Sequence, residues 1–146
     1  MIENRVLEQY EKTGYLKEPF KMFHLRDRIG QEYNFHYHDF YKIIYFVEGR
    51  VDYKIEGKTY QLKPHDFVLV DYNAIHKPEI DSSIPYERYV IYLSEKFVSR
   101  MNMAGESFGM CFELAEKKRN CVVHFSPGSY EKLLDIMLGN MVLPLR

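Results

Sequence analysis

The stretch that decides the fold is HYHDFYKIIYFVEG, from His36 to Gly49, together with a second block that ends at His76. His36 and His38 stand two residues apart, and side chains two apart on a β-strand point to the same face. His76 arrives about one hairpin later, so a small barrel would bring it to the same place. The pattern indicates either a metal cradle or a polar pocket derived from one.

Residues 20–93 show the rhythm of consecutive hairpins. Gly49 and Gly57 lie eight residues apart and predict two tight turns. Between them, residues 51–55 alternate apolar and polar side chains, which indicates a half-buried strand. Residues 86–93 form another candidate strand, in which Arg88 shares a face with the even-numbered neighbours. An all-β fold is therefore expected for this part of the chain.

After residue 93 the hydrophobic period becomes helical. Ser94 is placed to cap a helix, and residues 102–120 predict a second short helix. Residues 121–125 predict one more strand, and residues 126–138 an amphipathic helix that starts with Ser-Pro. The expected organisation is an N-terminal arm at 1–19, a β-barrel at 20–93 and a helical appendage of the same domain at 94–146.

The composition fits one globular domain and argues against nucleic acid as a direct partner. The chain has 146 residues, 46% hydrophobic and 28% charged, with a net charge of −1. Without a basic stripe, we expect these residues alone to bind DNA only non-specifically. The 13 Tyr and 10 Phe suit a β core, and a Tyr-lined cavity can stack on a sugar while its hydroxyls donate hydrogen bonds.

The cysteines and the chain's first residues indicate a cytoplasmic protein. Cys111 and Cys121 have no metal-ligand spacing; a disulfide between them stays open, and free buried thiols are the favoured interpretation. The first residues are polar and charged, so we predict no signal peptide. No apolar run approaches the roughly 20 residues of a membrane span, and no membrane partner is expected.

The first block resembles the cupin pattern of His-x-His, three residues, Glu, six residues and Gly. His36, His38 and Gly49 fit this pattern in register, but Lys42 stands where the pattern has Glu. In a metal cupin the three histidines and the carboxylate bind Fe, Mn, Ni or Zn. Lys42 shares the histidine face by parity, and a cation there raises the cost of binding a metal.

The second block, residues 64–76, resembles the cupin pattern more loosely. Pro64 and Asp66 match its Pro-x-Asp core, His65 replaces the usual Gly between them, and His76 matches the late histidine. We therefore predict no cofactor and no physiological metal. Three histidines alone can hold zinc, and any metal, physiological or adventitious, is expected on His36, His38 and His76.

The wording of both blocks, HYHDFYKIIYFVEGRVDYKIEGKTYQLKPHDFVLVDYNAIHKP, is most similar to the N-terminal sensor domain of AraC-type transcriptional regulators. The resemblance covers the chain from about residue 20 onward. It implies a cupin double-stranded β-helix followed by C-terminal helices, a ligand-sensing and dimerising role, often for a sugar, and no enzyme activity. We expect the sensor portion of a longer regulator, in which DNA is bound through a domain not in this chain.

The candidate site lies on strands whose alternation would aim it into the lumen. Lys42 and Arg88 would need a charged or hydroxylated partner there, which a sugar, a sugar acid or a small carboxylate would supply. The alternatives are that each histidine is a polar core residue and that each cation reaches solvent. Tyr45 is a weaker candidate because its parity opposes that of His38. The predicted ligand-binding residues are His36, His38, Lys42, Tyr53, His76 and Arg88.

Three functions remain in competition. No Ser/His/Asp order, nucleophile elbow or phosphate loop supports catalysis in general. We favour the effector sensor, acting as a homodimer whose arm, with Tyr10 and Tyr15, folds over the barrel mouth. The second is a metal-dependent cupin enzyme, an isomerase or dioxygenase, using His36, His38 and His76. The third is a bare oligomerisation module.

Overall fold

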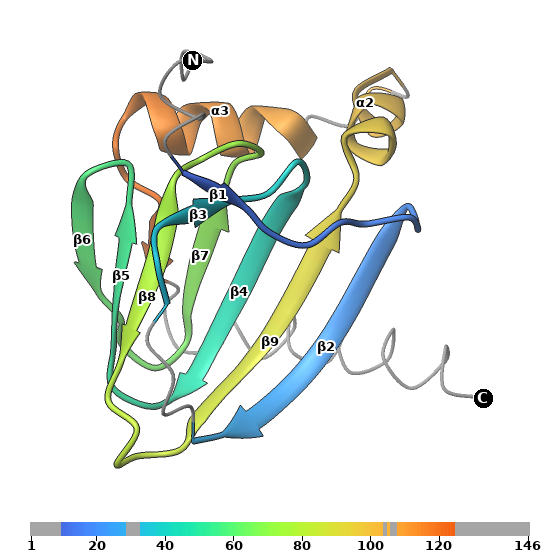
Figure 1. The fold of residues 1–146 in the computed structure, drawn as a ribbon. Helices are drawn as coiled ribbons and strands as arrows, with labels where there is room; N and C mark the ends of the chain where they lie inside the picture. Colours follow the sequence, from blue (N-terminus) through green and yellow to red (C-terminus); the bar gives the residue numbers. More distant parts are fainter. Residues whose placement is uncertain (1–9, 29–32, 104, 106–107, 125–146) are drawn as a thin grey trace.

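The computed structural model describes residues 10–28, 33–103, 105 and 108–124. Its strands form two five-stranded sheets that face each other (Figure 1). In order across the first sheet these are β1 (Glu11–Lys12), β3 (His36–Tyr37), β8 (His76–Ile80), β5 (Val51–Ile55) and β6 (Lys58–Gln61). Across the second sheet they are β10 (Val122–His124), β7 (Asp66–Val70), β4 (Tyr41–Glu48), β9 (Tyr86–Leu93) and β2 (Phe20–Asp27).

The core fills the space between the sheets, as the sequence alternation predicts. In β5 the side chains of Val51, Tyr53 and Ile55 are buried, and the two residues between them are only half-buried. They pack against the inward side chains of the second sheet, including Ile44 and Phe46 of β4. Burial of this apolar area is the main favourable term in forming the sandwich.

The two predicted glycine turns are present. Between β5 and β6, Glu56 (φ 47°) and Gly57 (φ 79°) both have positive φ, as a two-residue primed hairpin requires. Gly49, between β4 and β5, has φ 137°, and a Cβ there would lie 3.3 Å from the carbonyl oxygen of Pro85 and from the Cα of Tyr86. Both turns therefore require glycine, the second for space as well as for backbone angle.

The expected closed β-barrel is corrected to an open sandwich within the described residues. The strands at the sheet ends pair with no strand of the opposite sheet. Part of the reason is length, because β1 and β3 have two residues each and β6 has four. The all-β, mostly antiparallel architecture followed by helices is confirmed.

Two helices follow β9, as predicted. The N–H of Phe97 donates to Ser94 Oγ at 3.0 Å, which caps α2 (Glu95–Met103). Helix α3 (Phe108–Lys117) then lies over one end of the sandwich and buries Phe112 (Figure 1). The amphipathic helix predicted within residues 126–138 lies outside the described residues.

The cysteine prediction is partly wrong. Cys121 is buried, but Cys111 is exposed because it lies on the solvent side of α3. No disulfide joins the two. Among the described residues, no helix is long and apolar enough to cross a membrane.

Candidate functional site

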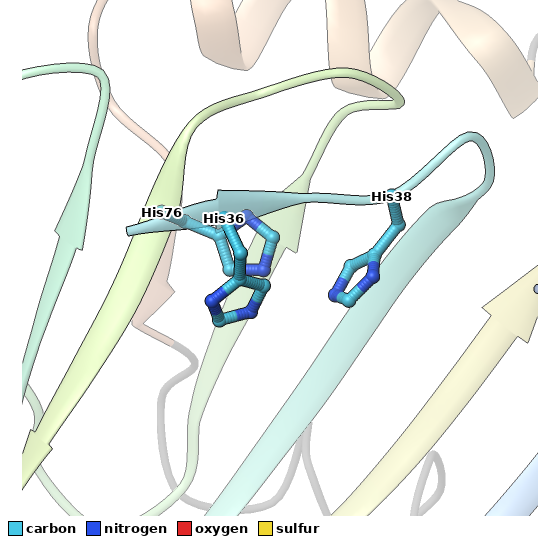
Figure 2. A group of neighbouring side chains, drawn as sticks. All are labelled: His36, His38 and His76. Atoms are coloured by element: carbon cyan, nitrogen blue, oxygen red, sulfur yellow. The ribbon is translucent and has the colours of Figure 1, made fainter. Parts of the chain in front are cut away.

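Three buried histidines converge between the sheets, as the sequence predicts. His36 in β3 lies directly opposite His76 in β8, and His38 follows β3 by one residue. One nitrogen from each ring lies within 4.8 Å of the others (Figure 2). The exposed fractions are 8% for His36, 7% for His38 and 0% for His76. We call these residues the histidine triad.

Backbone carbonyls hold each triad ring by its Nδ1 atom. A carbonyl oxygen can only accept a hydrogen bond, so each Nδ1 carries the proton and donates it. This leaves each Nε2 with a free lone pair in the neutral ring. The acceptors are the carbonyl oxygens of Asn34 for His36 at 2.7 Å, Thr13 for His38 at 2.7 Å and Ala74 for His76 at 2.8 Å.

Two of these Nε2 lone pairs are unusual because they are buried without a hydrogen-bond partner in the part of the chain that the structure describes. They belong to His38 and His76. A buried polar atom without a partner costs on the order of 1–3 kcal/mol. Imidazoles fixed by an Nδ1–H to carbonyl bond, with Nε2 free, are the usual state of metal-binding histidines. The triad therefore fits a transition metal.

The triad is held in the uncharged form that metal binding needs. Burial, followed by the charge of the nearby Lys42, lowers the pKa of His38 to about 4. Burial lowers the pKa of His76 well below its usual value, again with Lys42 as the next cause. Burial also lowers the pKa of His36. Neutral imidazoles can donate their lone pairs without first losing a proton.

Lys42 lies on the triad side of β4, as its parity predicts. Its side chain crosses from the second sheet to the first, and Nζ donates to the hydroxyl of Tyr53 at 3.2 Å. The ring of Tyr53 in turn stacks on that of His76, with centroids 6.1 Å apart. Burial lowers the pKa of Lys42. Within the described residues Lys42 has no ion-pair partner.

The structure brings five of the six predicted ligand-binding residues into one cluster. Arg88 is also buried, but its guanidinium donates to the carboxylate of Asp27 at 2.6 Å and to the carbonyl of Tyr86 at 2.9 Å. The protein therefore already supplies the partner that the sequence assigned to a ligand. Tyr45 lies on the opposite face of β4 and packs on Tyr89, as its parity predicts.

One contributor to the site was missed from the sequence. Residues 11–12 of the expected arm form β1, which pairs in parallel with β3, and this brings Thr13 against His38. The backbone carbonyl of Thr13 accepts from His38 Nδ1 at 2.7 Å, and the Thr13 hydroxyl lies 3.3 Å from the same nitrogen. Tyr15 of the same segment points to solvent and is 78% exposed. The arm thus orients a triad ring through its backbone.

A second group of titratable residues lies at the α3 end of the sandwich. The half-buried Asp71, just after β7, and Glu116 of α3 line a small cavity together with the buried Cys121. Burial, followed by the hydrogen bond to Glu116 and the negative charge of Glu116, raises the pKa of Asp71 to about 8. No local pattern in the sequence indicates this pairing, because it depends on how α3 packs.

Comparison with known protein families identifies the chain. Residues 20–108 match the model of the AraC-like ligand binding domain. The chain belongs to this family. The resemblance stated from the sequence is thereby confirmed, and a ligand-sensing role follows from it at the level of the family.

Solved structures with a similar arrangement include cupins. A Cupin 2 conserved barrel domain protein from Salinispora arenicola has 18% identity and a TM-score of 0.47, over 61% of this chain and 75% of that one. The DMSP lyase DddQ from Ruegeria pomeroyi has 20% identity and a TM-score of 0.46, over 53% of this chain and 39% of that one. Comparison with curated proteins gives no match.

Proposed function

We propose that this chain is the effector-sensing domain of an AraC-type transcriptional regulator and binds a small polar molecule between its two sheets. The observation that carries the proposal is the triad, in which the buried Nε2 atoms of His38 and His76 have no partner among the described residues. Buried polar atoms of that kind are costly, so their retention indicates a ligand that satisfies them. The family match supports the same role.

The rest of the regulator follows from this assignment. The domain acts as a homodimer in the cytoplasm, and DNA is bound through a domain outside this chain. With a net charge of −1, these residues have no electrostatic basis for tight DNA binding. Fluorescence anisotropy at physiological salt should show weak, sequence-independent binding. Tight binding that depends on sequence would contradict the sensor role.

A thermal-shift screen tests the pocket. Neutral sugars, sugar acids and small carboxylates are added to wild type, His76→Ala and Arg88→Ala, with His24→Ala as a matched control on the other side of the second sheet. A ligand that binds the folded state raises the melting temperature by mass action. We expect hits that His76→Ala weakens and His24→Ala preserves. Hits that survive His76→Ala would place the ligand elsewhere, whereas Arg88→Ala reports whether the site extends to the Asp27 pair.

A metal-dependent cupin enzyme is the second candidate, and the triad is the observation that favours it. Three histidines with an open fourth position are a known catalytic arrangement for zinc. The described interior offers no carboxylate bonded to the triad to act as a general base. Mass spectrometry of metal-loaded protein incubated with the hits separates the two: a sensor returns each ligand unchanged, and an enzyme converts it.

A further inference from the structure

We propose that the histidine triad holds a divalent transition metal, and that the effector is a compact chelating carboxylate bound jointly by this metal and Lys42. The inference deepens the proposed function and rests on it, because the effector occupies the same place between the sheets. Its two parts, a metal on the triad and an anion between that metal and the lysine, follow from different observations.

The metal part follows from the donor atoms. One nitrogen from each ring lies within 4.8 Å of the others. Because backbone carbonyls engage the Nδ1 atoms, the Nε2 atoms are the ones available to a metal. Three imidazoles suit Zn²⁺, Ni²⁺, Co²⁺ or Fe²⁺. Three protein ligands also leave at least one coordination position for an outside molecule.

The anion part follows from the charges around that centre. Three neutral imidazoles compensate none of the metal's two positive charges, and the ammonium of Lys42 adds a third. Lys42 is a cation whose charge lowers the pKa of every triad residue. Glu11 raises the pKa of His36 and Asp39 raises that of His38, but in each case Lys42 has the larger effect, and it lowers the pKa. Unbalanced buried charge is costly, so a bound anion is needed to offset it.

Lys42 is placed to hold that anion. An ammonium has three N–H donors, and among the described residues only one is engaged, with the hydroxyl of Tyr53. A carboxylate beside it would accept a charge-assisted hydrogen bond. The metal would take the other carboxylate oxygen and an adjacent hydroxyl or carboxylate. Because the triad residues are less than 10% exposed, the site suits a ligand of few atoms.

The experiment uses the full chain, stripped of metal with a chelator and then titrated with Co²⁺ as a spectroscopic probe. The anion probes are lactate, malate and oxalate, and lactamide is the uncharged counterpart of lactate. We expect one Co²⁺ per chain with a visible absorption spectrum that the carboxylates change and lactamide does not. In Lys42→Met, Co²⁺ should still bind, and carboxylate affinity should fall about tenfold or more.

Two controls keep the test decisive. Lys42→Arg keeps the charge and should recover part of the carboxylate affinity, which separates lost charge from a disturbed fold; circular dichroism checks the fold of each variant. His24→Ala should behave as wild type because His24 bonds Glu87 outside the triad. His76→Ala should bind no Co²⁺, because it removes one of the three metal ligands.

Each part of the inference has its own contradicting result. If folded wild type binds no Co²⁺, the triad is not a metal site. Carboxylate affinity that is absent, equal to that of lactamide, or unchanged in Lys42→Met removes the anion. If neutral sugars stabilise metal-free protein through His76, the sensor role stands and this inference fails. If no probe binds with or without metal, the proposed function fails as well.

Discussion

The six histidines of this chain divide into two groups that satisfy their nitrogens in opposite ways. Each triad residue donates its Nδ1–H to a backbone carbonyl, and the buried Nε2 atoms of His38 and His76 have no partner among the described residues. The other three, which we call the outer histidines, each bond another side chain: His24 to Glu87, His65 to Tyr45 and His124 to Asp66. Residue type alone therefore does not distinguish structural from functional histidines, but the partner of each nitrogen does.

The same contrast appears along one strand. In β4, Lys42 points between the sheets toward the triad, whereas Tyr45 points the other way and stacks on Phe67 and Tyr89. Tyr45 packs closely against other apolar side chains. On the triad side, the amine of Lys42 and the Nε2 atoms of His38 and His76 could each form more hydrogen bonds than the described residues provide. Buried polar atoms without such partners indicate function, because they destabilise the fold.

The largest expected effect is on metal binding. His76→Ala removes one of three ligands, and the affinity for Zn²⁺ should fall by about a thousandfold, or about 4 kcal/mol. His24→Ala, an outer-histidine control, should leave the affinity unchanged. Competition against a zinc-binding dye measures both. Equal losses of Zn²⁺ affinity in the two variants would mean that the triad and the outer histidines do not differ in metal binding.

The outer histidines should instead matter for stability. Asp66 is 2% exposed, and its carboxylate accepts hydrogen bonds from the backbone N–H of Lys63 at 2.7 Å and from His124. Asp66→Ala leaves the Lys63 N–H without its acceptor and should lower the free energy of unfolding by about 3 kcal/mol. Urea unfolding gives the value. Zinc affinity measured on the folded variant should match wild type; a parallel loss would show that the regions are coupled.

The carboxyl groups of Asp71 and Glu116, at α3, should make stability depend on pH. The pKa of Asp71 is raised to about 8, so the folded state binds a proton that the unfolded state has already lost above about pH 4. The contribution of this group to stability is therefore fully present below about pH 4, and it falls as pH rises toward 8. The loss should be on the order of 2 kcal/mol, less than an isolated group would give, because Glu116 shares the proton.

Asp71→Asn provides the matched control for that pH profile. The amide keeps the shape of the carboxyl group and donates to Glu116 at every pH. Wild type and variant share the rise in stability with pH that the triad residues give, because folding lowers their pKa values. The difference in the free energy of unfolding between wild type and Asp71→Asn, measured with urea between pH 5 and pH 8, should therefore fall as pH rises. A difference that stays constant over this range would mean that Asp71 ionises in the folded state as it does in the unfolded state.

Lys42→Glu should raise metal affinity, because it restores the carboxylate that the cupin pattern has at this position. The gain should be about tenfold for Zn²⁺, or about 1.4 kcal/mol, since an anionic ligand replaces a nearby cation. Isothermal titration calorimetry measures it, with Lys42→Gln to isolate the effect of removing the charge. If both variants bind Zn²⁺ equally, the new carboxylate does not reach the metal.

The sequence predicts the hairpins of the β fold and the triad because both depend on alternation within strands. His36 and His38 share a face by parity, and the glycine turns set the hairpins that return the chain to His76. The open sheet edges were not predicted, because they depend on how short the end strands are. The Thr13 contact was not predicted, because it depends on the pairing of β1 with β3. The bond from Arg88 to Asp27 escapes for another reason: the two residues meet only through the pairing of β2 with β9.

The smallest expected effect is also the sharpest test of why His76 is histidine. With no metal bound, His76→Leu removes a buried unpartnered Nε2 and keeps a side chain of similar volume, but it forfeits the Nδ1–H bond to Ala74. These terms nearly cancel, so the free energy of unfolding should stay equal or rise by about 1 kcal/mol. Urea unfolding with a chelator present measures the change. With Zn²⁺ added, wild type should gain stability and His76→Leu should not. A loss of about 2 kcal/mol in the metal-free variant would instead make His76 a polar core residue, because a residue kept for a ligand stabilises the protein only when that ligand is bound.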